Sequence, residues 1–457
     1  MSGDIKTSVS DIVFVNGYVY TADRRNPWAE AVAVEGGDII FVGPNGGSKN
    51  LIGSETKVVD LNGKMLLPGF HDAHCHPDQG GVMFTTYCGL FGLSKREKIF
   101  SRIREFTEKI PGDEWVLGTG WSLDAFQDMN PIKEDLDAVT AGHPAYMIAE
   151  DWHNIWLNSK ALSIMGIDKS TPDPHGGIIE RNAETGEPSG TLRESAIFLA
   201  QEFIPKEDLA TQAKGLKAAM KEANRFGIVS LLDAWCVDPI KEEAYKSLEN
   251  DGELTTRINL TLLVDERWNE DIDSLLNRRI LNNEMLISNQ VKLMVDGVME
   301  SQTAALKKAY IGTKGKKGIL YYSDEQLLKW IPLFESNGFQ THAHTMGDAA
   351  IAQVLDGLER SREINQKPNN RPCFIHNYLV DPADYPRLKK CNASTCFTML
   401  WRQQNETMLT LNKPYLEEEQ YINLMPMKQL ADYGILVTGG SDWPVSNISP
   451  LASIQIA

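Results

Sequence analysis

The sequence lacks the apolar segments that place a protein in or across a membrane. No uninterrupted apolar run approaches the roughly 18 residues that a membrane-spanning helix needs. The opening stretch, MSGDIKTSVSDIVF, is polar and has no basic region followed by an apolar one, as a secretion signal would. These absences argue against a membrane protein, and the expected location is the cytoplasm.

Cysteine and positive charge are also scarce. The six cysteines contain no C-x-x-C pair and no dense spacing, unlike the disulfide framework of a small secreted domain, so we expect reduced thiols. The 45 lysines and arginines are outnumbered by 62 aspartates and glutamates, and the formal net charge is -17. This charge would repel nucleic acid and an anionic membrane surface. The G-x-G-x-x-G and P-loop patterns of nucleotide cofactor sites are absent as well.

What is present is an ordinary globular composition in a long chain. Hydrophobic residues make up 42% and charged residues 23% of the 457 positions. Because a single core stops growing at roughly 250–300 residues, this length predicts a large domain with an accessory domain. A small or fibrous protein is excluded.

Short β segments dominate the first part of the chain. Residues 11–67 alternate apolar and polar positions and are interrupted by Asn-Gly and Gly-Gly turns, which predicts a small antiparallel sheet module. We expect residues 1–66 to form the N-terminal part of a β-sandwich module that precedes the main domain at 67–457.

The remaining chain alternates apolar strands with amphipathic segments of helical period, such as LATQAKGLKAAMKEANRF and SDEQLLKWIPLFESN. Eight such strands predict an α/β fold of the (β/α)₈ TIM barrel type. The expected strands are 65–70, 227–234, 258–264, 291–297, 338–345, 373–380, 394–399 and 434–442.

One connection in this barrel is far longer than a barrel needs. Residues 97–210 separate the first two expected strands and contain strand candidates of their own, EWVLGTGW and PAYMIAED. We expect this insertion to cap the barrel mouth.

Polar residues end several of the apolar strands, and in a barrel of this type reactive groups lie at those ends. His74 and His76 are two positions apart, so in an extended chain they face the same side, together with Asp72. A single buried histidine is most often only hydrogen-bonded. A same-face pair that recurs with His344, His376 and Asp442 favours a divalent metal site instead, since unpartnered buried imidazoles and carboxylates would each be costly.

Lys292 lies within an apolar strand, VKLMVDG, although lysine is rarely buried without a partner. One interpretation is a salt bridge, to Asp296 or to a neighbouring strand. The other is that CO₂ adds to its neutral amine, giving a carbamate that bridges two metal ions.

Several motifs together resemble one known family. These motifs are LLPGFHDAHCHP, VKLMVDGVMESQTAAL, THAHTMGDAAI, FIHNYLV and TGGSDWPVS, with HNIWLNSKALSIMGI and TPDPHGGIIERNAETGEPSGTLRESA in the insertion. In their order and spacing they look like the amidohydrolase superfamily, specifically its YtcJ-like branch of metal-dependent hydrolases. The resemblance covers about residues 11–457.

The resemblance implies a ligand set for one or two zinc ions, or other divalent metals, made of His74, His76, Lys292, His344, His376 and Asp442. His344 is preferred over His342 because it begins the family's H-x-x-G-D segment. Asp442 would also be catalytic, taking a proton from the attacking water and delivering it to the leaving nitrogen. The metal, with His376 or His342, would stabilise the oxyanion.

The expected activity is hydrolysis of a C–N bond in a small non-peptide amide. Ring opening of a cyclic amide or imide, and deamination, are alternatives at the same site, and a metal-binding protein without turnover is an alternative of another class. Substrate contacts are expected from His342, for which a supporting position behind the metal ligands is the alternative, and from three residues of the insertion, Trp121, Trp152 and His153. Core packing or dimer contacts are the competing interpretation of these three.

The chain ends at SPLASIQIA, shortly after the eighth expected strand. Relatives continue through further strands that complete the small β module. If the chain is truncated, we expect its N-terminal strands to present unpaired edges, which would favour a homodimer or aggregation.

Overall fold

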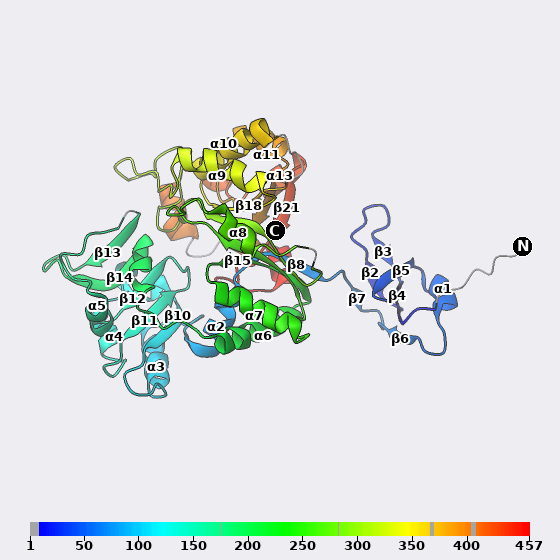
Figure 1. Cartoon of the computed structure of the whole chain (residues 1–457), viewed down its shortest axis with the longest axis horizontal. Coiled ribbons are helices and arrows are strands. Elements are labelled where there is room, and N and C mark those ends of the chain that lie inside the picture. The colour runs from blue at the N-terminus through cyan, green and yellow to red at the C-terminus, as the bar shows by residue number, and fades with distance from the viewer. Residues whose placement is uncertain (1–8, 175, 282, 366–369, 404–407) are drawn as a thin grey trace, which may run out of the picture. The chain divides into compact units, whose positions relative to one another are not determined.

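The computed structural model describes residues 9–174, 176–281, 283–365, 370–403 and 408–457. It divides into two compact units, Met1–Phe70 and His71–Ala457 (Figure 1). Each unit is described below by itself.

The N-terminal unit contains two small sheets. The first has the strand order β5-β4-β1-β6 and the second β3-β2-β7. Strands β1 and β6 pair in parallel, as do β2 and β7, so the module is mixed and the expected purely antiparallel sheet is wrong. A sandwich arrangement of the two sheets stays a prediction. The strands are β1 (Ile12–Val15), β2 (Tyr18–Tyr20), β3 (Trp28–Ala29), β4 (Ala31–Glu35), β5 (Asp38–Gly43), β6 (Lys57–Asp60) and β7 (Met65–Leu66).

The second unit is built on an eight-stranded sheet of the TIM-barrel kind. Neighbouring strands from β15 to β21 pair in parallel, and β8 completes the order next to β15. The strands are β8 (Phe70–Cys75), β15 (Ile228–Cys236), β16 (Arg257–Leu263), β17 (Leu286–Met294), β18 (Gln340–Thr345), β19 (Cys373–His376), β20 (Ser394–Phe397) and β21 (Leu436–Gly439).

The two outer strands of this sheet meet just beyond their C-terminal ends. The backbone N–H of Asp442 donates to the carbonyl of His74 at 2.8 Å, and that of His76 donates to the carbonyl of Trp443 at 2.8 Å. Gly440 permits this approach, because a Cβ at that position would lie 2.7 Å from His74 Cβ. The sheet is therefore nearly closed into a barrel.

Seven of the eight expected barrel strands overlap the observed ones over several residues, whereas the first is displaced and shares only Phe70 with β8. Residues 65–70 were expected to form it, but Met65 and Leu66 belong to the small sheet β3-β2-β7. The barrel strand begins at Phe70 and runs through the histidine-rich segment to Cys75. The apolar run before that segment therefore leads into the barrel and is not its first strand.

Helices follow the barrel strands, and both segments of clear helical period are confirmed as helices, α6 and α9. α9 starts with a capping box between Ser323 and Gln326. The helices are α1 (Asn45–Ser48), α2 (Pro77–Thr86), α3 (Arg96–Thr107), α4 (Lys133–Asp137), α5 (Ser159–Met165), α6 (Leu209–Arg225), α7 (Pro239–Asn250), α8 (Ile272–Arg278), α9 (Asp324–Ser336), α10 (Asp348–Asn365), α11 (Tyr385–Lys390), α12 (Glu418–Ile422), α13 (Met427–Asp432) and α14 (Pro450–Ile456).

Between β8 and β15 the chain forms a second sheet, with the strand order β13-β14-β12-β11-β10-β9 (Figure 1). We call residues 88–205, which contain this sheet, the insertion. Its strands are β9 (Cys88–Gly89), β10 (Val116–Trp121), β11 (Ala145–Ala149), β12 (Asn154–Leu157), β13 (Gly177–Arg181) and β14 (Pro188–Glu194). β10 and β11 match the two strand candidates read from the sequence, whereas β9 begins before the expected boundary at residue 97.

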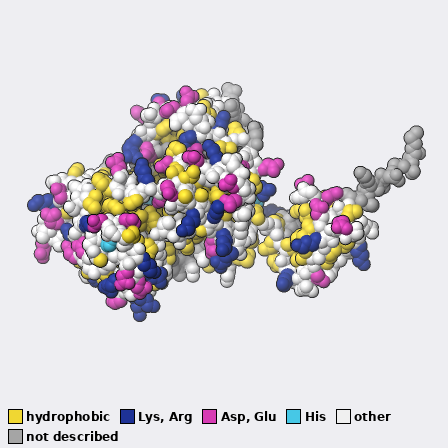
Figure 2. Space-filling view, turned by 60° about the horizontal axis from the view of Figure 1, so that its bottom comes forward, with side chains coloured by type: hydrophobic (Ala, Val, Ile, Leu, Met, Phe, Trp, Pro, Cys, Tyr) yellow, Lys and Arg dark blue, Asp and Glu magenta, His cyan; other side chains and the backbone are white. Residues whose placement is uncertain are grey.

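All six cysteines are free thiols, as expected. On the face drawn in Figure 2, acidic and basic side chains are interspersed. Within the described ranges, no helix combines the length and apolar character required to cross a bilayer. Cytoplasmic location and dimer formation stay predictions.

Candidate metal centre

The parallel barrel brings the predicted ligands to one edge of the sheet. His74 is in β8, Lys292 in β17, His344 in β18 and His376 at the end of β19, while His76 and Asp442 come directly after β8 and β21. Because the strands run parallel, these C-terminal ends converge at one mouth of the barrel. The topology therefore gathers side chains that are hundreds of residues apart in the chain.

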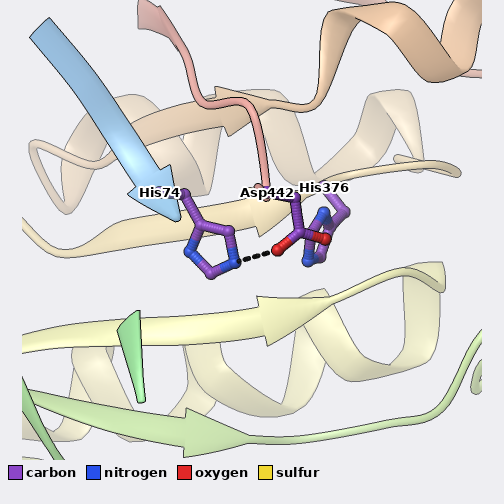
Figure 3. Close-up of side chains that lie close together, drawn as sticks. All are labelled: His74, His376 and Asp442. Atoms are coloured by element: carbon purple, nitrogen blue, oxygen red, sulfur yellow. Dashed lines mark ion pairs between the residues drawn. The ribbon is translucent and has the colours of Figure 1, made fainter. Parts of the chain in front are cut away.

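Three of these side chains form the tightest group. His74, His376 and Asp442 each offer one ligand atom, and these atoms lie within 4.8 Å of one another (Figure 3). His74 Nε2 is 3.2 Å from Asp442 Oδ1, and His76 Nε2 is 3.0 Å from the same oxygen. All four residues are buried. The Asp442 carboxylate is thus shared by two histidines.

The other ring nitrogen of three histidines is held by a neighbouring side chain. His344 Nδ1 lies 3.2 Å from Asp296 Oδ1, and His376 Nδ1 lies 3.1 Å from Thr398 Oγ1. His74 Nδ1 lies 2.9 Å from His342 Nε2. Such partners fix the ring orientation and the tautomer of metal-binding histidines. In His344 and His376 the Nε2 atom is then left for a ligand, while His74 Nε2 faces the Asp442 carboxylate.

The charges of the site favour metal binding. Burial, and then the positive charge of Lys292, hold the pKa of His74 and of His344 well below the ordinary value. Burial also lowers the pKa of His376 strongly. Burial alone would raise the pKa of Asp442, but the hydrogen bond from His76 and nearby positive charges keep it below its usual range. At neutral pH the site therefore offers neutral imidazoles and a carboxylate, the forms that ligate metals.

Lys292 is only 1% exposed, and burial lowers its pKa to about 8. Among the described residues, no hydrogen bond or ion pair engages its Nζ atom. The alternative of a salt bridge to Asp296 is wrong, because that carboxylate accepts hydrogen bonds from the backbone N–H groups of Ala305, Met346 and Gly347. A buried lysine with a depressed pKa has an appreciable neutral fraction near neutral pH.

The donor set fits a divalent metal. Nitrogen and carboxylate oxygen are the ligands that zinc takes from histidine and aspartate. His76 Nδ1 is buried without a hydrogen-bond partner among the described residues, so the site still contains polar atoms that the protein leaves unsatisfied. His376 and Asp442 also adopt positive φ values, 71° and 56°, a strain that recurs at functional sites.

A cavity of about 610 Å³ opens over this centre. All six predicted ligands line it, together with residues of the insertion such as Tyr146, Ile148 and Phe198. Aromatic and aliphatic side chains therefore enclose the space beside the polar centre, as in sites for small molecules.

The sequence of residues 57–457 matches the amidohydrolase family. The chain belongs to this family. The resemblance seen in the motifs is thereby confirmed, and membership supports hydrolase chemistry.

Two relatives and one solved structure illustrate the likeness. The chain is 27% identical to YtcJ of Bacillus subtilis (strain 168), over 97% of this chain and 83% of that protein. It is 26% identical to the N-substituted formamide deformylase of Arthrobacter pascens, over 97% of this chain and 82% of that one. An uncharacterised metal-dependent hydrolase from Pyrococcus horikoshii OT3 has the same fold, with a TM-score of 0.77 and 21% identity over 98% of this chain and 85% of that one.

Two of the four expected substrate contacts line the cavity of this amidohydrolase. Trp152 and His153 do so, and the Trp152 ring centroid lies 5.6 Å from that of His76. Trp121 is instead fully buried in the core of the insertion, against Phe126 and Trp156. Packing therefore accounts for Trp121, which corrects the expectation of a substrate contact.

His342 takes the supporting position that was the alternative to a substrate contact. It is fully buried, does not line the cavity and lies behind His74, with its Nε2 against His74 Nδ1. Its place one strand repeat before His344 directs it inward, below the mouth of the barrel. It can orient His74, but it does not reach a substrate in the cavity.

The sequence-based reasoning missed Glu194, at the end of β14. Its Oε2 lies 2.7 Å from His153 Nδ1, and its Oε1 accepts a hydrogen bond from Thr303 Oγ1 at 2.6 Å. Burial alone would lower the pKa of His153, but the charges of Glu194, Asp151 and Glu300 raise it to about 9. Its place at a strand end was a signal for its position, whereas its pairing with His153, 41 positions away, leaves no local signal in the sequence.

Asp72 acts as a support of the centre. Its Oδ1 accepts hydrogen bonds from the backbone N–H groups of His74, at 3.2 Å, and Ser441, at 2.9 Å. Burial raises its pKa to about 6. Asp72 therefore ties the first barrel strand to the loop that carries Asp442.

Proposed function

We propose that this amidohydrolase cleaves a C–N bond of a small non-peptide amide, using water activated at a divalent metal centre with zinc as the expected metal. The observation that carries the proposal is the convergence of six ligand-type side chains, from five barrel strands and the segments that follow them, on one cavity. The name of the A. pascens relative, N-substituted formamide deformylase, refers to the same class of bond.

The residues that would hold one or two metal ions are His74, His76, Lys292, His344, His376 and Asp442. A bound divalent cation would lower the pKa of a water molecule and polarise the carbonyl oxygen of the substrate. For Lys292, we propose that the neutral amine adds CO₂ and loses a proton, which converts a buried cation into an anionic ligand. The low pKa of this lysine and its lack of an ion-pair partner among the described residues support the carbamate.

Asp442 is the proposed proton carrier. Its pKa lies below the usual range, so it is a carboxylate at neutral pH and can accept a proton. As the water oxygen bonds to the carbonyl carbon, Asp442 takes the water proton, and it returns this proton to the nitrogen as the C–N bond breaks. The products are a carboxylic acid and an amine.

The test is turnover of a panel of N-formyl and N-acyl amines by zinc-loaded protein, with Asp442→Ala as the variant and Asp168→Asn as a control at an exposed aspartate. We expect hydrolysis of at least one panel member, a loss of about 1,000-fold or more in Asp442→Ala, and none in the control. Tight zinc binding without Asp442-dependent turnover of any C–N substrate would favour a metal-binding protein. Ammonia release from an amino-heterocycle would favour deamination.

A further inference from the structure

His153 presents one ring nitrogen to the cavity and uses the other to hold Glu194. Its Nδ1 is 2.7 Å from Glu194 Oε2, and its side chain is 15% exposed. Within the described ranges no partner engages Nε2. Burial lowers the pKa of His153, but the charges of Glu194 and of two further carboxylates raise it to about 9, so at neutral pH both ring nitrogens carry a proton. With Nδ1–H donated to Glu194, the ring has a second N–H donor at Nε2.

The ring has little freedom to move, because Glu194 is itself anchored. Thr303 Oγ1 donates to Glu194 Oε1 at 2.6 Å, and the Tyr321 hydroxyl donates to Glu194 Oε2 at 3.3 Å. The backbone N–H of Glu194 donates to the His153 carbonyl at 2.9 Å. Glu194 adopts φ 51° and ψ -130°, a conformation that non-glycine residues rarely hold without such restraints. The pair thus links the insertion to the segment that follows β17.

This donor lies beside the metal centre. The ring centroids of His153 and His344 are 6.4 Å apart, and the neighbouring Trp152 ring lies against His76. Both His153 and His344 line the same cavity.

The histidines first expected to assist the oxyanion are less well placed. His342 does not line the cavity, and its Nε2 is engaged with His74. His376 has its Nδ1 on Thr398, so its Nε2 is the atom left for a metal. Among the described residues that line the cavity, His153 is the one histidine outside the predicted ligand set.

We propose that His153 is a catalytic residue, whose Nε2–H donates a hydrogen bond to the carbonyl oxygen of the scissile amide, and that Glu194 is the positioning residue that holds its ring. The assignment rests on the proposed function. When the water oxygen bonds to the carbonyl carbon, the π pair moves onto the carbonyl oxygen, and it returns when the C–N bond breaks. His153 keeps its proton throughout, because it stabilises the charge without transferring a proton.

The kinetic test compares zinc-loaded His153→Ala with His143→Ala, a histidine of the insertion that hydrogen-bonds the Glu114 carbonyl and does not line the cavity. We expect kcat of His153→Ala to fall about 100-fold, with KM changed less than about threefold and zinc content unchanged. Added imidazole should restore part of kcat.

Glu194→Gln tests the positioning role. Alone it should lower kcat about tenfold, and in the His153→Ala background it should not lower kcat, since Glu194 acts through the His153 ring. A kcat loss below threefold in His153→Ala, or equal losses from Glu194→Gln in both backgrounds, would overturn the assignment.

A binding measurement decides the assignment even if no substrate of the panel is hydrolysed. Phenylphosphonate is a tetrahedral anion that resembles the charged oxygen formed during attack, and calorimetry measures its affinity for zinc-loaded protein without turnover. His153→Ala should bind it about tenfold more weakly than wild type and His143→Ala. Equal affinity in all three, including no binding in any, would overturn the role of His153. Absence of turnover in the wild type would instead count against the proposed function alone.

The kinetic comparison of His153→Ala with the wild type also distinguishes two possible partners of His153, the carbonyl oxygen of the amide and a carboxylate of the substrate. If the partner is the carbonyl, kcat falls equally for neutral amides and for amides that carry a carboxylate. A higher KM confined to carboxylate-bearing amides would overturn the proposal.

Discussion

The barrel mouth and the insertion both bring histidines of low exposure to the same cavity, and they place them in opposite charge states. In the barrel, burial and the nearby Lys292 lower the pKa of His74 and His344. In the insertion, the His153 side chain is 15% exposed, and although burial lowers its pKa, the Glu194 carboxylate raises it to about 9. Partial or full burial is common to both regions, so the charge of the neighbour decides whether the imidazole is neutral, as a metal ligand must be, or cationic.

Removing Lys292 should have the largest effect on the barrel side of this contrast. We expect Lys292→Ala to lower zinc affinity at least tenfold and turnover about 1,000-fold, because the proposed anionic carbamate ligand would be lost. Short carboxylic acids should restore part of both, since a carboxylate can take the place of the carbamate. Metal analysis and panel kinetics measure the outcome, with Lys206→Ala, a second lysine that lines the cavity, as the control.

Full zinc occupancy in Lys292→Ala would refute a bridging role for this lysine. The barrel half of the comparison would then rest on the histidines and Asp442 alone.

On the insertion side, the contrast can be measured as a pH dependence of stability. The folded pKa of His153 is raised to about 9 from an ordinary 6.5, so the pair with Glu194 stabilises the protein fully below about pH 6.5 and loses this contribution as the pH rises through 9. The quantity to compare is the unfolding free energy of the wild type minus that of Glu194→Gln. This difference should be larger at pH 6 than at pH 10, by on the order of 3 kcal/mol.

Urea unfolding of both proteins at the two pH values gives this difference. Glu180→Gln, whose carboxylate pairs with Arg193 elsewhere in the insertion, is the matched control and should show a gap that does not depend on pH over this range. A gap between wild type and Glu194→Gln that is constant from pH 6 to pH 10 would contradict a protonated His153.

The smallest expected effect concerns the support of a barrel histidine. Thr398→Val removes the hydroxyl 3.1 Å from His376 Nδ1 at nearly constant volume, so the ring loses its orienting partner. We expect about tenfold weaker zinc affinity in a competition assay with a chromophoric chelator, and an unchanged fold. Thr395→Val, a buried threonine of β20 that binds a backbone carbonyl, serves for comparison and should keep the wild-type affinity.

The barrel was predictable because its strands carry a strong local signal, an apolar run followed by a polar residue. The displaced first strand shows where that signal fails, since MLLPGF is as apolar as a strand but enters a different sheet. The turns of the small module suggest hairpins and therefore predict antiparallel pairing. The parallel pairing of β1 with β6 is a long-range contact that has no local signature in the sequence.

The convergence of His74, His376 and Asp442 was predictable for the same reason as the barrel, since each marks a strand end, while their role as metal ligands stays a prediction. The role of Glu194 was not, because it depends on contacts with His153 and Thr303 that lie far away in the chain. Trp121 and Trp152 look alike in the sequence, and only packing separates a core residue from one that lines the cavity.

Metal content per chain tests the central claim most directly. Freshly purified wild-type protein, analysed by mass spectrometry of the elements, should carry one or two divalent metal ions per chain, and a crystal structure should show a carboxyl group on Lys292 Nζ. The double variant His74→Ala/Asp442→Ala should carry almost none. A wild type that binds no metal at saturating zinc, or a double variant with full occupancy, would contradict the account.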